Sequence, residues 1–322
     1  MKENYKIAKI SREEALEIWN KSINSSVFNN PNFLSFYEGS EFFGAFKGEE
    51  LYCCWPVIIN EDKLEIPEFF YYLGPYWSYK FYEKKIHSRF SLSIDIYNCF
   101  IEKFLKKYNK IHFQTHYSLT DIRAFDWYNY GESIEKKFCI KNKYTAIIEN
   151  LNLKNKENLL SNFRYVRRYE IKNFEKLKKN ISKTDFKSRE AVDLYLQTSN
   201  YNNSKDEEIK KRNILKLVDI AKKGFGEICC FKEKKTNKLI SFSLILFEKK
   251  NINLVINCAD KDWKRKGIMA WGINENLKLY IKKYNNFDFN GANSPHRGDD
   301  KHSYGANEKL FFDIMYVNNI SK

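Results

Sequence analysis

The segment from residue 251 to residue 291 decides the fold. It opens with the strand-like run NINLVINCA (Asn251–Ala259), continues through a helical stretch from about Trp263 to Tyr284, and closes on FDFNG (Phe287–Gly291). A helix that joins two strands returns the chain to the starting edge of the sheet, so the two strands are expected to be parallel. The segment therefore predicts a strand–helix–strand crossover.

Two more strand-like runs come directly before this crossover. They are GEICCFKE (226–233) and KLISFSLILFE (238–248), and short turns separate them from each other and from NINLVINCA. Strands joined by such short turns pair antiparallel. The order of three antiparallel strands, a helix and a parallel strand predicts a mixed, mainly antiparallel sheet flanked by helices.

The first half of the chain repeats this plan after a starting helix, Ser11–Lys21, whose Ser11 and Glu14 predict a capping box. Its expected strands and long helix are Glu41–Phe46, Leu51–Ile59, Phe69–Leu73, Lys84–Tyr108 (the helix) and Lys110–His116. A chain of 322 residues is long enough for two domains. We therefore expect a duplicated α/β (α+β) unit, with an N-terminal domain over residues 1–150 and a C-terminal domain over residues 151–322.

Composition and charge limit the kinds of partner. The formal net charge is +15, which favours anionic partners. No apolar run reaches the ~18 residues of a membrane span, and the start MKENYKIAKI has no apolar signal region. The seven cysteines include no C-x-x-C, and HFQTH (112–116) lacks the glutamate of H-E-x-x-H. We expect no metal and a cytoplasmic protein, with peripheral attachment at the inner membrane face as a further option.

Three arginines stand close together in RYVRRYEIKN (164–173), within a long helix expected from Asn155 to Lys178. A helical wheel places Val166 and Arg167 on the apolar face, with Glu170 nearby, and places Arg164, Arg168 and Lys172 along one edge. An arginine that faces a core needs an anionic partner. Two readings stay open: an internal Arg167–Glu170 pair, or an edge that binds a substrate phosphate or carboxylate through Arg164, Arg167, Arg168 and Lys172.

The order of elements and several short motifs resemble the FemAB-like superfamily of tandem GNAT acyltransferases. The motifs that carry the resemblance are SSVFNNPNFLSFY (25–37), YYLGPYW (71–77), DIRAFDWYNYG (121–131), KYTAIIENL (143–151), NFRYVRRYEIKN (162–173), FDFNG (287–291) and KHSYGA (301–306). The resemblance implies an acyl-CoA donor. It departs from the GNAT pattern at KRKGIM (264–269), where a single glycine stands in the phosphate loop.

In a GNAT fold the strands NINLVINCA and FDFNG would splay apart and expose backbone amides toward an acyl donor. The donor-binding residues implied are Leu254, Val255, Ile256 and Cys258, with a phosphate turn formed by Lys264, Arg265, Lys266 and Gly267. Lys301 would stabilise an oxyanion or bind a donor phosphate. An acceptor amine must be neutral to attack, so a general base or a water relay is needed. The candidates are Asp288, which alternates with apolar neighbours, and then Tyr304 and His302.

The favoured hypothesis is an N-acyltransferase that moves an acyl group, with acetyl from acetyl-CoA as the first choice, to an amine of a sugar or cell-envelope precursor. The acceptor would be an anionic small molecule, a sugar nucleotide or a lipid-linked precursor. A second hypothesis is an aminoacyl-tRNA-dependent transferase that acts on a peptidoglycan precursor, with tRNA as partner. A third is a non-catalytic basic protein that binds RNA or serves as a scaffold.

Overall fold

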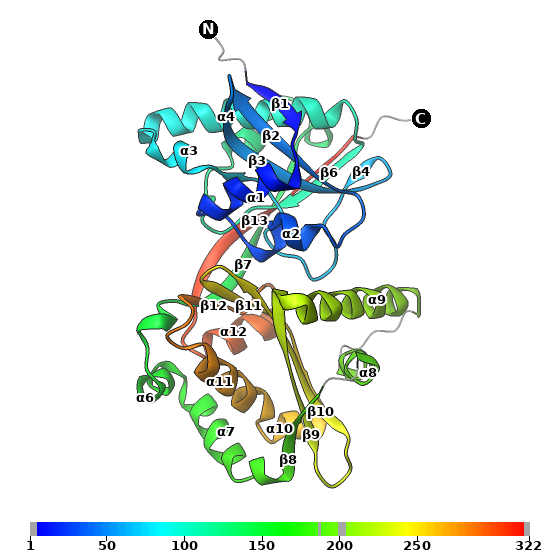
Figure 1. The fold of residues 1–322 in the computed structure, drawn as a ribbon, viewed down its shortest axis with the longest axis vertical. Coiled ribbons are helices and arrows are strands. Elements are labelled where there is room, and N and C mark those ends of the chain that lie inside the picture. The colour runs from blue at the N-terminus through cyan, green and yellow to red at the C-terminus, as the bar shows by residue number, and fades with distance from the viewer. Residues whose placement is uncertain (1–4, 186–187, 199–203, 319–322) are drawn as a thin grey trace. The chain divides into compact units, whose positions relative to one another are not determined.

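The structure is a computed structural model that describes residues 5–185, 188–198 and 204–318 (Figure 1). It divides into two compact units, one formed by residues 1–143 with 310–322 and the other by residues 144–309. The chain enters the second unit within β7 (Cys139–Ile148) and returns to the first within β13 (Asn307–Val317). The expected boundary at 150/151 therefore lies near the first crossing, but residues from 310 onward group with the first unit.

The first unit contains a mixed sheet of strand order β1-β2-β3-β4-β6-β13, with β5 paired to β3. Its pairs are antiparallel except for β4 and β6, which are parallel. Its strands besides β13 are β1 (Lys6–Lys9), β2 (Ser40–Lys47), β3 (Glu50–Asn60), β4 (Lys63–Leu64), β5 (Tyr76–Trp77) and β6 (Lys110–Gln114). Its helices are α1 (Arg12–Lys21), α2 (Pro31–Leu34), α3 (Tyr79–Glu83), α4 (Ile86–Leu105) and α5 (Arg123–Asp126), with 3₁₀ turns at Val27–Asn29 and Ile134–Lys136.

Helix α1 begins where the sequence predicts, and its capping box is confirmed. The Glu14 amide donates to Ser11 Oγ at 3.1 Å, and the Ser11 amide donates to Glu14 Oε2 at 2.8 Å. The long helix α4 turns its apolar face to the sheet, where Trp55 meets Phe100 and Phe104 edge-on at 5.3 and 5.2 Å between ring centroids. An aromatic core therefore fills the first unit.

The predicted strand Phe69–Leu73 is wrong. This segment is irregular, and the backbone of both Phe69 (φ 67°) and Tyr72 (φ 57°) is left-handed, which no strand allows. The Leu73 carbonyl nevertheless accepts a hydrogen bond from the Gln114 amide at 3.0 Å. The segment thus lies along the end of β6 without forming a strand.

The second unit contains a mixed sheet of order β7-β12-β11-β10-β9-β8, with β11 and β12 as its parallel pair. The other pairs are antiparallel, as the sequence predicts for β9, β10 and β11. Its remaining strands are β8 (Ile181–Thr184), β9 (Gly226–Glu233), β10 (Leu239–Glu248), β11 (Asn251–Ala259) and β12 (Asn286–Asp288). Its helices are α6 (Lys156–Leu159), α7 (Tyr165–Glu175), α8 (Ser188–Thr198), α9 (Ser204–Ile220), α10 (Lys261–Arg265), α11 (Ile268–Tyr280) and α12 (Pro295–His302), with short 3₁₀ turns at Leu151–Leu153, Leu160–Asn162 and Lys178–Asn180 and a π turn at Ala221–Phe225.

The single helix expected from Asn155 to Lys178 is instead broken before Tyr165. Phe163 and Arg164 are extended, and the Arg164 amide donates to the Ser303 carbonyl at 2.9 Å. The residues before and after the break therefore do not share one helical wheel. The wheel placed Val166 on the apolar face, which is wrong, because Val166 is exposed. The predicted helix Trp263–Tyr284 is likewise divided into α10 and α11 by Gly267, whose φ is 93°.

The fold class is thus the expected α/β (α+β) arrangement, with a mixed, mainly antiparallel sheet and flanking helices in each unit. In the second unit, α7 packs against α11, and both contribute to the core. Across the described ranges, no helix is long and apolar enough to cross a membrane, and no group of His, Cys, Asp and Glu is arranged to hold a metal ion.

Candidate active site

The parallel pair β11/β12 is the structural centre of the candidate site. It is short: Asn251, Ile252 and Asn253 face Asn286, Phe287 and Asp288 in turn. Beyond Asn253, β11 continues to Ala259 with β10 along one edge, while no strand among the described residues pairs with its other edge. The backbone from Leu254 to Cys258 therefore extends past the end of its parallel partner, which is the arrangement expected of a GNAT donor site.

Polar side chains line one face of this pair. Ile252 and Phe287 belong to the core that includes α7 and α11, so alternation turns Asn253 and Asp288 to the opposite face of the sheet. Both are buried. Two groups donate hydrogen bonds to Asp288 Oδ1: the Thr145 hydroxyl, and the Asn290 backbone amide at 2.8 Å. Asp288 is thus a carboxylate held in place at the point where the two strands part.

Asn290 is a candidate residue that the sequence reading missed. Its side chain is 3% exposed, and neither its Oδ1 nor its Nδ2 has a hydrogen-bond partner within the described part of the chain. Its backbone is left-handed, with φ at 49°. An unpaired buried amide costs about 1–3 kcal/mol, and its place beside Asp288 makes Asn290 a candidate polar group of the site. The available signal was its place in FDFNG, two residues after Asp288.

Lys301 fixes the turn that follows β12. Its ammonium group donates to the Phe289 carbonyl at 2.9 Å and to the carbonyls of Asn290 and Gly291. Three carbonyls match the three donors of an ammonium group. These contacts position the backbone around Asn290, and the oxyanion or phosphate role expected of Lys301 stays a prediction.

Arg167 connects α7 to the C-terminal part of α12 and to the capping residue of that helix, Ser303. Its Nη1 donates to Glu170 Oε2 at 2.6 Å, its Nε donates to Ser303 Oγ at 2.7 Å, and its Nη2 donates to Asp300. Its guanidinium also lies 5.4 Å from the centre of the Tyr304 ring. The predicted internal Arg167–Glu170 pair is present. The rigid five-donor fork explains why arginine stands here, since lysine could not reach all three partners at once.

The other residues of the predicted anion edge lie apart from β11 and β12. Arg164 Nη1 donates to Asp299 at 2.6 Å, and both side chains are largely exposed. Arg168 and Lys172 are exposed on α7, which packs against α11. The structure brings together Arg164 and Arg167 with α12, while Arg168 and Lys172 contact neither strand among the described residues. Acceptor binding at this edge stays a prediction.

Tyr304 and His302, the other predicted bases, differ in surroundings. The Tyr304 ring stacks on Phe289 at 5.5 Å and meets Phe163 edge-on at 5.4 Å. Burial raises the pKa of its phenol, so the phenol stays protonated at neutral pH and packing accounts for its presence. His302 is partly exposed, with Nδ1 3.1 Å from the Ala306 carbonyl and Nε2 3.7 Å from Glu308.

The predicted phosphate turn sits at the join of α10 and α11. Lys264, Arg265 and Lys266 are exposed, and the Lys266 ammonium lies 4.3 Å from the centre of the Trp263 ring. Gly267 is buried, and a Cβ added to it would lie 3.0 Å from the Glu170 carbonyl oxygen on α7. The start of α11 is therefore covered by α7, so a phosphate here would be held by the three cations rather than by the helix amides. This role stays a prediction.

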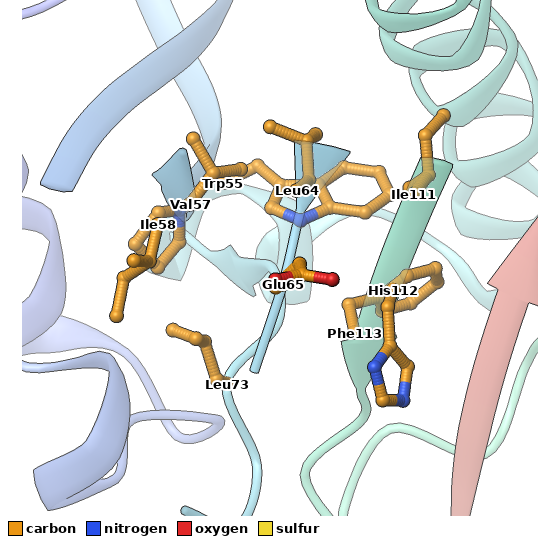
Figure 2. Close-up of a pocket in the computed structure, with 10 residues that line it drawn as sticks. Trp55, Val57, Ile58, Leu64, Glu65, Leu73, Ile111, His112 and Phe113 are labelled. Carbon is orange, nitrogen blue, oxygen red and sulfur yellow. The ribbon is translucent and has the colours of Figure 1, made fainter. Parts of the chain in front are cut away.

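The first unit has a small cavity beside its own parallel pair, β4/β6 (Figure 2). Apolar side chains, including Trp55, Leu64 and Leu73, form most of its wall. Its two ionisable groups are already paired: Glu65 accepts from Lys110 Nζ at 3.0 Å, and His112 Nε2 lies 2.9 Å from Asp313 Oδ1. The cavity offers no carboxylate comparable to Asp288, so we place the candidate site in the second unit.

Comparison with solved structures agrees with this geometry. The chain is similar to a FemX protein (TM-score 0.63, 11% identity, 97% of this chain and 98% of that one) and to a tandem GNAT protein from the clavulanic acid biosynthesis pathway (0.56, 7%, 99% and 100%). It is also similar to L-PGS from Bacillus licheniformis (0.51, 12%, 97% and 94%). No protein-family model and no curated protein matches the sequence.

These similarities define the class of fold. The chain has the FemAB-like tandem-GNAT fold, as the sequence motifs predict, with one GNAT-like sheet in each unit. It thereby shares its architecture with these three proteins over nearly its whole length. The structures with a TM-score above 0.5 are only 7–13% identical to this chain, so they establish its fold and not its chemistry. The chemistry has to be argued from the residues.

Proposed function

We propose that this protein is an N-acyltransferase that moves an acyl group from acyl-CoA to an amine, with the reaction at the end of the β11/β12 pair. The observation that carries the proposal is the meeting of three features at one point: the parted strands, the buried carboxylate of Asp288 and the unpaired amide of Asn290. The first offers backbone groups to a donor, and the other two offer polar groups to the reacting centre.

The donor would lie along Leu254, Val255, Ile256 and Cys258, with its phosphates near the cations of Lys264, Arg265 and Lys266 and the turn at Gly267. The acceptor amine attacks the thioester carbonyl directly, and the carbon–sulfur bond breaks as the carbon–nitrogen bond forms. The proton lost by the amine passes to Asp288, directly or through one water, and is returned to the departing thiolate. Lys301 acts here as a positioning residue, because its ammonium holds the carbonyls around Asn290.

In its finer form the proposal names acetyl-CoA as donor and an amine of a sugar or cell-envelope precursor as acceptor. Arg164, Arg168 and Lys172 would bind an anionic group of that acceptor, and the protein would work in the cytoplasm. An aminoacyl-tRNA donor is the competing proposal, and its support is the net charge of +15. A non-catalytic basic protein is the third.

Donor binding separates these three. The purified chain is titrated with acetyl-CoA, free CoA and charged tRNA while the melting temperature is followed. Stabilisation by acetyl-CoA and CoA supports the proposal, stabilisation by charged tRNA alone replaces it with the second, and no response to any ligand favours the third.

The carboxylate is tested by Asp288→Asn, which keeps the size and one hydrogen-bond acceptor. We expect unchanged binding of acetyl-CoA and a fall in kcat of about 100-fold, the usual contribution of a general base. Asp219→Asn, at an exposed position of α9, is the matched control and should leave kcat unchanged. A full kcat in Asp288→Asn would remove Asp288 from the mechanism without affecting the assignment of the donor.

A further inference from the structure

Helix α7 carries an unusual concentration of exposed aromatic surface. Tyr165 is 73% exposed and Tyr169, one turn later, is 54% exposed, and their rings stack with centroids 6.3 Å apart. Val166 beside them is 49% exposed. Exposed large apolar side chains that gather within one turn and a half of a helix indicate a contact surface rather than a chance exposure.

Three cations border these rings. Arg168 and Lys172 on α7 and Lys176 at its C-terminal cap follow at helical spacing along the same side, and all three are exposed. Within the described part of the chain none of them forms an ion pair, in contrast to Arg164, which is paired with Asp299, and Arg167, which is paired with Glu170 and Asp300. We call this set, with the two tyrosines and Val166, the α7 outer face.

Contacts on the opposite side of α7 fix the orientation of the outer face toward solvent. Ile171 and Phe174 on the opposite side are buried in the core, and Arg167 is tied to the end of α12. Rotation of α7 about its axis would break these contacts. The aromatic and cationic side chains are therefore presented to the surroundings without a prior rearrangement.

We propose that the α7 outer face docks this protein onto an anionic lipid bilayer. Cations near such a surface are attracted by its negative potential, and tyrosine rings with a polar tip sit favourably at the level of the headgroups. The face joins both kinds of side chain on one rigid helix. The inference shares Arg168 and Lys172 with the acceptor edge of the proposed function, but it does not rest on acyl transfer, since it concerns how the protein reaches a surface and vesicle binding is measured without donor or acceptor.

A bilayer fits the outer face better than RNA does. Single-stranded RNA is bound by stacking of bases on open aromatic rings, whereas Tyr165 and Tyr169 stack on each other. The phosphate backbone of a duplex attracts the cations but makes no favourable contact with exposed Val166 or the tyrosine rings. The apolar and aromatic part of the face is thus explained by a lipid interface alone.

The test measures partition of the full chain onto vesicles by cosedimentation. Vesicles of phosphatidylcholine alone are compared with vesicles in which about a third of the lipid is phosphatidylglycerol. The variant is Arg168→Gln with Lys172→Gln and Lys176→Gln, which keeps good helix formers in place. The matched control is Lys106→Gln with Lys141→Gln and Lys235→Gln, three exposed lysines elsewhere whose loss gives the same net charge.

We expect the wild type to bind only the anionic vesicles, and the α7 variant to bind about 100-fold more weakly, from roughly fivefold per cation. The control should bind as the wild type does. Tyr165→Ala with Tyr169→Ala should weaken binding by a smaller factor and leave its salt dependence unchanged. Circular dichroism and the melting temperature confirm that each variant is folded.

Three results would overturn the proposal. One is a wild type that does not bind anionic vesicles at low salt. Another is equal loss in the α7 variant and the control, which would mean that total charge alone governs binding. The third is a variant that keeps vesicle binding but loses binding to an RNA duplex, which would assign the face to nucleic acid instead.

Discussion

Each unit of this protein contains one parallel strand pair, β4/β6 in the first and β11/β12 in the second. The two pairs differ in what lies beside the strand that extends past its partner. In the first unit, β4 stops at Leu64, and the position beside the end of β6 is taken by the chain itself, where the Leu73 carbonyl accepts from the Gln114 amide. In the second, β12 stops at Asp288, and no described strand lies beside the rest of β11. In the first unit, the segment around Leu73 fills the gap between the parting strands. In the second unit, backbone and polar side chains lie along the gap.

The side chains around the two pairs follow the same division. Trp55, Phe113 and Phe125 surround the first pair with interlocking rings. Thr145 and Asn290 accompany Asp288 at the second. Aromatic packing stabilises a fold, whereas buried polar groups cost stability unless they serve binding or catalysis. The comparison therefore favours the second pair over the first as the place of the proposed chemistry.

The largest expected effect is on the closure in the first unit. A Cβ added to Gly74 would overlap the backbone carbonyl oxygen of Gln114, which cannot move without breaking β6. We expect Gly74→Val to lower the free energy of unfolding by about 4 kcal/mol or more, as for other severe backbone clashes. Urea unfolding measures it. Gly48→Val meets no atom around its Cβ position and carries only the strain of a left-handed backbone (φ 61°), so it should cost less than the clash at Gly74, and an equal loss there would refute the closure.

The next effect is at Arg167, which holds the terminal segment of the second unit. Arg167→Met leaves Glu170 and Asp300 without their shared cation, and we expect a loss of about 3 kcal/mol, the lower end for a broken buried pair because Asp300 is half exposed. Arg167→Lys should lose about half as much. Thermal unfolding of both variants measures this, with Arg164→Met as a control on an exposed pair. A negligible loss in Arg167→Met would mean that the fork does not position the segment.

A third effect is a pH dependence of stability that comes from a buried histidine of the first unit. Burial lowers the pKa of His116 in the first unit to about 3 from 6.5, and its Nδ1 accepts from the Ser118 amide at 3.2 Å, so it is neutral when folded. A folded-state pKa below the unfolded one means that the unfolded chain binds more protons. Stability is then complete above about pH 6.5 and falls as the pH drops toward 3.

At pH 5 this histidine should cost about 2 kcal/mol relative to pH 7.5. Urea unfolding at the two values, in the wild type and in His116→Asn, isolates its share. The variant should show a smaller decline with acid by that amount. An identical decline in both proteins would show that His116 is not kept neutral by the fold.

The smallest effect on stability is the most informative about the second unit. Asn290→Gly removes an unpaired buried amide and suits the left-handed backbone, so we expect the free energy of unfolding to rise by about 1 kcal/mol. Acetyl-CoA should bind about tenfold more weakly, as expected from the loss of one hydrogen-bonding group. Isothermal titration and urea unfolding provide both values. A variant that is less stable and binds acetyl-CoA normally would assign Asn290 to the fold instead.

Much of the architecture was predictable because it is encoded locally. The runs that became β9, β10 and β11, the crossover to β12 and the capping box of α1 depend on residues close together in sequence. The Arg167–Glu170 pair was predictable for the same reason, since the two stand three residues apart.

The features that sequence reasoning missed depend on distant contacts. The break before α7 follows from the bond between the Arg164 amide and the Ser303 carbonyl, which no local pattern encodes. The irregular path at Phe69 and Tyr72 requires left-handed backbone in bulky residues, against their intrinsic preference. Asn290 was missed because its unpaired side-chain amide becomes visible only in the folded turn, and the three carbonyl partners of Lys301 could not be predicted for the same reason.

The path of β13 has a consequence for how the protein is made. This strand follows the whole second unit in the chain, yet its residues from Asp313 to Val317 pair with β6 of the first unit. On the ribosome, the first unit cannot acquire this strand until the entire second unit has been translated. The first unit therefore cannot be completed in strict N-terminal-first order, because its last strand is made after the residues of the second unit.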